Sequence, residues 1–168
     1  MSGIIVDSRA RTLTAFGQTM RCAIGRSGAV AADAKREGDG ATPLGRWPLR
    51  GLLLRPDRVS PPRTGLPWRW LREADGWSDD PADPAYNRPV THPHTGSAER
   101  LWRADGAYDL IIILGHNDDP PVPGHGSAIF WHVAQPDFGP TEGCVAIERA
   151  AFEVLLPRLG PGLALEIV

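Results

Sequence analysis

Short apolar runs, each bounded by glycine, proline or charged residues, recur along the chain. Three of them come first, at residues 4–6, 12–16 and 20–24, and polar or glycine punctuation separates them. Runs of this length that are rich in β-branched residues are typical of strands. The beginning of the chain therefore predicts a meander of three strands, with turns at residues 9–11 and 17–18.

A long segment without a regular pattern follows. A glycine-rich loop at residues 38–45 precedes a predicted strand at 47–54. Eight prolines then break any helix of useful length between residues 55 and 103, yet four of the six tryptophans lie in the same segment. A disordered linker would not carry so many large apolar side chains. We expect an ordered, loop-rich excursion that packs over the sheet and forms one wall of a binding groove.

Regular structure returns in the last third of the chain. The run Leu110-Ile111-Ile112-Ile113-Leu114 is typical of a strand buried on both faces. A stiff, proline-rich loop at 117–126 precedes predicted strands at 127–134, 144–147 and 163–168. The clearest helical pattern spans residues 149–159, with Pro157 near its end. These patterns predict one mainly β domain over residues 1–168, with a single helix in its C-terminal half and long ordered loops.

Composition and charge exclude several classes of protein. Glycine and proline supply 36 of the 168 residues, which argues against a bundle of long helices. A net charge of −2 argues against nucleic-acid binding, which is typical of strongly basic domains. Two cysteines exclude a disulfide-dense scaffold and a four-cysteine zinc site. The chain has no apolar run long enough to insert into a membrane. Its first residues lack a secretory signal, so the sequence alone indicates a cytoplasmic protein.

Cys144 and His132 form a candidate catalytic pair. A nucleophilic thiol needs a base, an oxyanion hole and a fixed backbone. His132 lies on a predicted strand and supplies the base, while the backbone N–H groups of Gly143 and Cys144 supply oxyanion donors. A neighbouring imidazole is expected to lower the thiol pKa toward neutrality. The alternative is that both side chains are structural, because a cysteine followed by Val-Ala-Ile is often a small buried hydrophobe.

Three separated motifs occur in order along the chain. They are Thr42-Pro43-Leu44-Gly45 with the residues from 35 onward, Gly115-His116-Asn117-Asp118, and Ile129-Phe130-Trp131-His132 followed by Pro140-Thr141-Glu142-Gly143-Cys144. Together with Gly126-Ser127-Ala128 they resemble the signature of L,D-transpeptidases with the YkuD catalytic domain. In that family a strand-borne histidine precedes a Ser/Thr-x-Gly-Cys stretch. The chain resembles a compact, proline-rich branch of the family.

The resemblance implies a YkuD-like fold, a β-sandwich or barrel-like mixed sheet, and an acyl-transfer reaction. Cys144 is then the nucleophile and His132 the general base, with its imidazole oriented by the carbonyl of Val133 or a neighbour. The thiolate attacks the L-centre carbonyl of a peptidoglycan stem attached to its glycan. An amine of a second stem then resolves the thioester to form a cross-link. The resemblance implies no metal or organic cofactor, carbapenems as inhibitors, and action in the periplasm or cell envelope.

Five further residues are candidates for substrate binding by the same resemblance: Thr141, Glu142, His116, Asn117 and Ser127. Glu142 and Ala146 depart from the family pattern, which often has His and Arg or Asn there. A carboxylate beside the thiol would raise its pKa unless it is turned outward. We expect Glu142 to attract the ammonium group of the acceptor. His116 lies near the substrate groove or on a surface loop. His92 and His94 are surface residues rather than metal ligands.

Several alternatives stay open. The donor is attacked at its first residue (L-Ala) or at its third, and the loop at residues 120–123 is expected to narrow the donor entrance. The thioester passes either to an amine or to water, which would make the protein a peptidoglycan carboxypeptidase or amidase. A non-catalytic envelope-binding module with a structural Cys144 is the third reading. Cys22 is expected to be a buried, reduced thiol within a strand.

Overall fold

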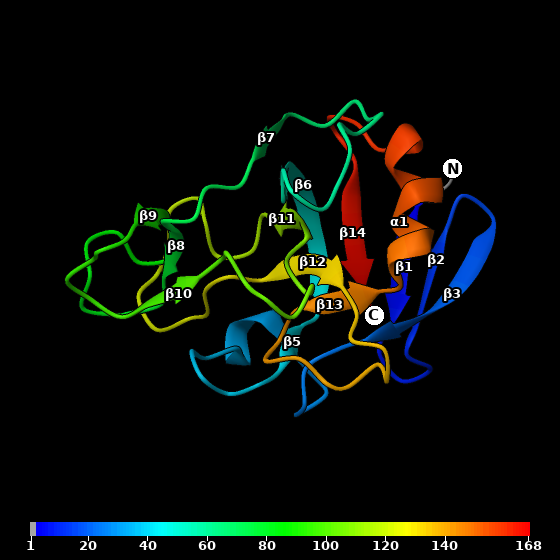
Figure 1. Cartoon of the computed structure of the whole chain (residues 1–168). Helices are drawn as coiled ribbons and strands as arrows, with labels where there is room; N and C mark the ends of the chain where they lie inside the picture. The colour runs from blue at the N-terminus through cyan, green and yellow to red at the C-terminus, as the bar shows by residue number, and fades with distance from the viewer. Residues whose placement is uncertain (1–2) are drawn as a thin grey trace.

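The computed structural model describes residues 3–168, and most of its strands belong to one large mixed sheet (Figure 1). The strand order is β11-β12-β13-β3-β2-β1-β14-β6-β7, and β11 also pairs with β6. Every strand of this sheet except β7 therefore belongs to a closed ring. The prediction of a mainly β, barrel-like mixed sheet is confirmed. The strands are β1 (Ile4–Asp7), β2 (Thr12–Ala15), β3 (Gln18–Ala23), β6 (Gly45–Leu54), β7 (Trp68–Trp70), β11 (Leu110–Leu114), β12 (Phe130–Val133), β13 (Val145–Ile147) and β14 (Ala164–Ile167).

Strand β6 closes the ring because it is long enough to serve two partners. Its first residues pair antiparallel with β14, where Pro48 lies opposite Ala164. Its second half pairs antiparallel with β11, where Leu52 lies opposite Ile112. Pro48 has no N–H to donate, yet its carbonyl still accepts from Gly115 at 2.8 Å. One strand thus joins β14 to β11 and closes the ring.

The helix is shorter than the apolar pattern predicts. α1 spans Arg149–Leu155, and a 3-10 turn, η2 (Leu156–Arg158), replaces the rest of the expected helix. Pro157 lies within that turn, where it lacks the N–H that an α-helix needs and clashes with the preceding turn. The buried face of α1, with Phe152 and Leu155, belongs to the main hydrophobic core.

The segment from residue 55 to 103 contains more regular structure than its prolines indicate. β8 (Asp75–Ser78), β9 (Pro89–Thr91) and β10 (Ala98–Arg100) form a small antiparallel sheet in the order β10-β8-β9. This sheet forms a lobe on the left of Figure 1. A second hydrophobic cluster, which includes Trp77 and Leu101, joins the lobe to the outer face of β11 and β12. The expectation that this segment is ordered and packs over the sheet is confirmed.

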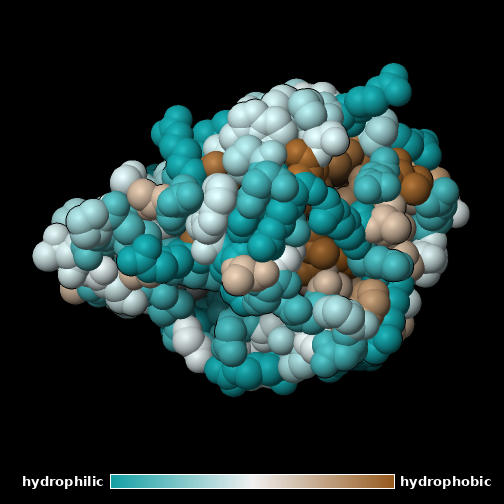
Figure 2. Space-filling model, viewed as in Figure 1, coloured by the Kyte–Doolittle hydropathy of each residue, from teal (hydrophilic) through white to brown (hydrophobic). Residues whose placement is uncertain are grey.

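The glycine-rich loop is anchored by two very short strands. β4 (Ala29–Val30) pairs in parallel with β5 (Thr42–Pro43), and a 3-10 turn, η1 (Ala32–Ala34), lies between them. Figure 2 shows a mostly hydrophilic surface on the face seen in Figure 1, with apolar residues in small separate areas. No helix within residues 3–168 is long and apolar enough to cross a membrane.

Candidate active site

The alternation of side chains along β12 and β13 places His132 and Cys144 on the same face of the sheet. Trp131 and Val133 point into the main core, so Phe130 and His132 point to the other side. β12 and β13 are parallel, and His132 lies opposite Ala146. Cys144 comes two residues before Ala146 and therefore shares its face. The pairing explains why His132 and Cys144, which are separated along the chain, lie on the same side of the sheet.

His132 and Cys144 both line a cavity of about 410 Å³. Asp79, Glu99 and Arg103 of the segment from residue 55 to 103 form one wall of this cavity, as the sequence predicts, and Ala107 and Tyr108 extend it. The glycine-rich loop and the loop before Cys144 form other parts of the cavity wall. The further lining residues are Lys35, Glu37, Gly38, Asp79, Glu99, Arg103, Ala107, Tyr108, Ser127, Ala128, Ile129, Gln135, Gly139, Pro140, Thr141, Glu142 and Ala146.

His132 is held by the backbone of its own strand. Its Nδ1 lies 2.9 Å from the carbonyl oxygen of Val133, so Nδ1 carries the proton and Nε2 holds the free lone pair. This is the carbonyl that the sequence analysis expects to orient the imidazole. Burial lowers the pKa of His132 to about 4, with a smaller raising effect from the Val133 hydrogen bond. The imidazole is therefore neutral near pH 7 and able to accept a proton at Nε2.

Cys144 is a buried, neutral thiol. Its Sγ donates to the carbonyl of Ala128 at 3.2 Å and accepts from the N–H of Phe130 at 3.4 Å. Burial, with a smaller contribution from the charge of Glu99, raises the thiol pKa to about 12. The expectation of a pKa near neutrality is wrong for the free protein, because a neutral imidazole has no positive charge with which to stabilise a thiolate. Within residues 3–168, the hydrogen bonds of Sγ do not include His132.

Gly143 is required by the packing of two loops. Its φ of +138° is a conformation that favours glycine, and a Cβ there would lie 2.8 Å from the carbonyl oxygen of Ala41. The absence of a side chain at Gly143 therefore allows a close contact with the glycine-rich loop. The Gly143 N–H donates to the Thr141 hydroxyl at 3.1 Å, and that hydroxyl donates to the carbonyl of Cys144 at 2.7 Å. Thr141 therefore shapes the turn that presents Cys144.

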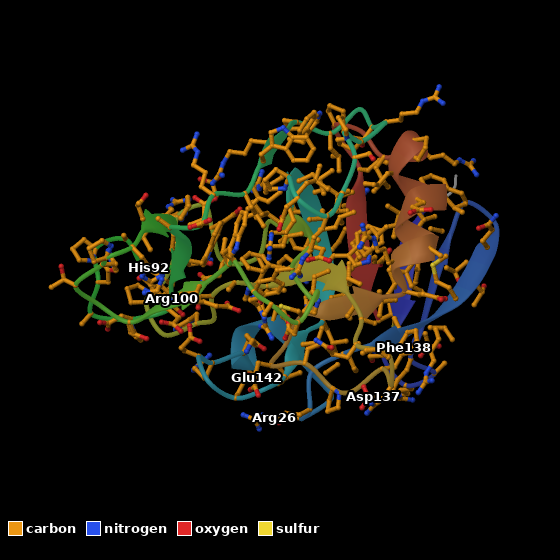
Figure 3. All side chains as sticks on the ribbon, viewed as in Figure 1. Arg26, His92, Arg100, Asp137, Phe138 and Glu142 are labelled. Carbon is orange, nitrogen blue, oxygen red and sulfur yellow. The ribbon has the colours of Figure 1, made fainter. Side chains whose placement is uncertain are left out.

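Glu142 is turned outward, to the rim of the cavity. Its side chain is 78% exposed and pairs with Arg26 at 2.9 Å, and Figure 3 shows the two side by side. Arg26 also donates to the carbonyl of Gly38 at 3.3 Å, so it links the loop before Cys144 to the glycine-rich loop. Arg26 already balances the charge of Glu142. Ala146, the other departure from the family pattern, leaves only a methyl group opposite His132.

The three remaining binding candidates differ in position. Ser127 lines the cavity and donates to Glu37. His116 and Asn117 are not among the lining residues. His116 is buried, with its ring edge-on to Trp47 at 4.8 Å, and burial lowers its pKa to about 4. The alternative of a surface histidine is therefore wrong.

Asn117 organises the proline-rich loop instead. It donates to the carbonyls of Val122 at 3.1 Å and Gly126 at 2.9 Å, and it accepts from the Val122 N–H at 2.8 Å. Among residues 3–168, those at positions 117–126 are absent from the cavity lining. The structure thus does not place residues 120–123 at an entrance to this cavity.

His94 and Cys22 have contacts that are consistent with a structural role. His94 pairs with Asp83 at 2.5 Å, and the described part of the chain has no group of three or more side chains suited to a metal ion. Cys22 is a buried free thiol in β3, as the sequence predicts, and burial raises its pKa to about 11. Glu99, Arg103 and Tyr108 also line the cavity, but no local sequence pattern connects them to the motif residues.

A comparison with protein-family models matches residues 2–167 to YkuD, the L,D-transpeptidase catalytic domain. No curated protein matches the chain. Two solved structures are similar to it. One is L,D-transpeptidase 1 of Mycobacterium tuberculosis, with 11% identity and a TM-score of 0.45, where the match covers 99% of this chain and 61% of that chain. The other is Bd1075 of Bdellovibrio bacteriovorus, with 18% identity and a TM-score of 0.49, covering 99% of this chain and 47% of that chain.

This chain thus spans less than two thirds of the length of either structure. The match to the family model, by contrast, includes all the strands of the closed sheet and the two candidate catalytic residues, His132 and Cys144. The chain belongs to the YkuD family of L,D-transpeptidase catalytic domains.

Proposed function

We propose that this domain is a cysteine-dependent acyltransferase that cross-links peptidoglycan stem peptides. Cys144 is the nucleophile and His132 the general base. The observation that carries this proposal is the position of the imidazole. The Val133 carbonyl holds Nδ1, so the basic Nε2 is left for the cavity that the Cys144 thiol also lines.

Acylation starts from a neutral thiol and a neutral imidazole. As Sγ attacks the carbonyl carbon of the donor stem, its proton leaves the Ala128 carbonyl and passes to Nε2 of His132. The C–S bond forms in the same step, since a free thiolate is costly in this buried site. Collapse of the tetrahedral intermediate then breaks the C–N bond to the D-residue, and His132 gives its proton to the leaving amine.

The oxyanion of the intermediate needs donors. We assign them to the backbone N–H groups of Gly143 and Cys144. In the free protein the Gly143 N–H is bonded to the Thr141 hydroxyl, so it exchanges that partner for the oxyanion. Thr141, Glu142 and Ser127 line the cavity and are the candidates for substrate contact.

Deacylation follows the same path in reverse. An amine of the acceptor stem gives its proton to Nε2 of His132 as it attacks the thioester. The new C–N bond forms, the C–S bond breaks, and the proton returns to Sγ. Peptidoglycan lies in the cell envelope, so we propose the periplasm or envelope as the place of action. Carbapenems are proposed to acylate Cys144 in place of the donor.

Mass spectrometry of the products tests the proposal. Defined disaccharide-peptide monomers are incubated with the wild type, Cys144→Ala and His132→Gln. We expect dimers from the wild type and a loss of about 10³-fold or more in both variants. A carbapenem adduct should appear by intact mass on the wild type and on Cys22→Ala, and be absent from Cys144→Ala.

The same products separate the alternatives. Shortened monomers without dimers would assign hydrolysis of the thioester, as in a carboxypeptidase or amidase. Full activity of Cys144→Ala would show that Cys144 is not the nucleophile. The absence of both products and adduct in the wild type would leave a non-catalytic envelope-binding module. The masses of the donor fragments also reveal whether the first or the third residue of the stem is attacked.

A further inference from the structure

Tyr108 is a buried aromatic residue on the wall of the cavity next to His132. It lies just before β11, and its ring centroid is 5.2 Å from that of His132, with the ring planes at 77°. Its ring also meets Phe130 edge-on at 5.9 Å. Tyr108 therefore borders the imidazole on the side that faces the cavity wall.

The phenol ring is itself fixed from two sides. Its hydroxyl donates to the carboxylate of Glu99 on β10. The guanidinium of Arg103 lies over the ring, 4.8 Å from the ring centroid. The preceding carbonyl, that of Ala107, accepts the N–H of Val133 at 3.1 Å. The segment that carries Tyr108 is thus tied to the strand that carries His132.

The imidazole needs such a contact. Its Nδ1 hydrogen bond goes to the next residue of the same strand, and the Ala107 backbone also acts on the ring. The direction of Nε2 therefore also depends on the side chains packed against the ring. Proton transfer from Sγ to Nε2 requires a heavy-atom distance and direction fixed within a narrow range. A displacement of about 1 Å at such a site costs about 10²-fold in rate.

We propose that Tyr108 is a positioning residue for His132: the ring of Tyr108, anchored by Glu99, keeps Nε2 of the imidazole directed into the cavity. This role rests on the proposed function, in which His132 is the base. The Tyr108 hydroxyl donates to Glu99, and the hydrogen bonds of the Cys144 thiol go to Ala128 and Phe130, so Tyr108 acts through the imidazole. The lobe formed by β8, β9 and β10 thereby helps to organise the site, because Glu99 belongs to it.

Two substitutions at position 108 separate the ring from the hydroxyl. Tyr108→Phe keeps the ring contact, and Tyr108→Leu removes it. The chain offers a matched control in its other tyrosine: Tyr86 is equally buried and also donates to a glutamate, Glu37, at 2.8 Å. Tyr86→Leu removes the same kind of contacts at a place that does not touch His132.

The first readout is the nitrogen NMR spectrum of ¹⁵N-histidine-labelled protein, with His132→Gln assigning the signal. We expect a single Nδ1–H tautomer in the wild type, Tyr108→Phe and Tyr86→Leu, and a tautomer mixture in Tyr108→Leu. The His132 pKa, about 4 in the wild type, should rise by one unit or more in Tyr108→Leu. The other charged groups near the imidazole, Arg103, Asp105 and Glu99, are unchanged in these variants.

The second readout is turnover. Tyr108→Leu should lose about 10²-fold in kcat with KM changed less than threefold, and Tyr108→Phe should restore most of it. An unchanged His132 spectrum in Tyr108→Leu would overturn the positioning role. Equal losses in Tyr108→Leu and Tyr108→Phe would overturn it too, because the hydroxyl would then be the essential group.

A second variant covers the case in which Tyr108→Leu does not fold. Tyr108→Met removes the aromatic ring but fills more of its volume with a flexible side chain. We expect a tautomer mixture of His132 in this variant as well, and an unchanged His132 signal would overturn the role. The spectrum reports on the imidazole whether or not the protein turns over substrate, so failure of the proposed function is distinguishable from failure of this inference.

Discussion

At the scale of single residues, the burial of Cys144 controls how readily its thiol reacts. With the thiol pKa raised to about 12, alkylation by iodoacetamide should be slow at pH 7 and rise about tenfold per pH unit up to pH 11. The measurement is intact mass against time in the Cys22→Ala background, where Cys144 is the single thiol. A plateau near pH 8.5 would contradict the effect of burial.

Two carboxylates near Cys144 allow a sharper version of this experiment. The charge of Glu99 raises the thiol pKa, whereas Glu142 points to solvent and pairs with Arg26. Glu99→Gln should therefore speed the alkylation of Cys144 several-fold at pH 8. Glu142→Gln is the control and should leave the rate unchanged. Equal effects of the two substitutions would show that Glu142 also acts on the thiol.

Gly143 is a residue whose replacement should be costly, because strain and a backbone clash coincide there. Alanine there combines a φ of +138° with a Cβ 2.8 Å from the Ala41 carbonyl oxygen. We expect Gly143→Ala to lower the free energy of unfolding in urea by about 2–3 kcal/mol. Gly17→Ala is the control: its φ is +82° but no atom lies within 4 Å of the added Cβ. It should cost about 1 kcal/mol, and equal losses would argue against the clash.

At the scale of elements, the loop at residues 117–126 should be separable from the active site. Asn117 holds this loop, and its prolines do not line the cavity of Cys144. Replacing Pro121 and Pro123 by glycine should leave donor choice and turnover unchanged. The free energy of unfolding should fall by about 0.5–1 kcal/mol per residue, because the unfolded chain gains freedom. If mass spectrometry showed a changed donor preference in this variant, the loop would have to contact the donor at the entrance of the cavity.

Elements with a local pattern were predictable from the sequence. β1, β2 and β11 have burial that follows the apolar positions, so each begins and ends within about one residue of its predicted range. β8, β9 and β10 were missed because strands of three or four residues among prolines have no period long enough to detect. α1 was overextended because its apolar spacing continues past Pro157, whose effect on the backbone outweighs that spacing.

The residues of the candidate site also fall into those with a local sequence pattern and those without one. His132 and Cys144 stand in a motif, and the alternation of two strands explains why they meet. The cavity walls carry no such pattern. Tyr108 lies beside His132 just before β11, and Glu99 contacts Tyr108 from a separate lobe. Chain neighbours do not reveal contacts of this kind.

At the scale of the whole molecule, buried neutral groups set the pH range of stability. His116 and His132 both have their pKa lowered from 6.5 to about 4 by burial. Between these values the unfolded chain binds more protons than the folded one, so stability falls as the pH drops from 6.5 toward 4. Cys22 and Cys144 act in the opposite direction. Their pKa values rise from 9.0 to about 11 and 12, so stability falls as the pH rises above 9.

We therefore expect a plateau of stability between about pH 6.5 and 9 in urea unfolding. Each buried histidine contributes a slope of up to about 1.4 kcal/mol per pH unit on the acid side. His116→Gln should remove one such contribution, and the double variant with His132→Gln should flatten the limb between pH 6.5 and 4 further. Cys22→Ala should reduce only the alkaline slope. A constant free energy of unfolding from pH 6.5 to 4.5 in the wild type would mean that both imidazoles take up protons without opening the fold, which their burial forbids.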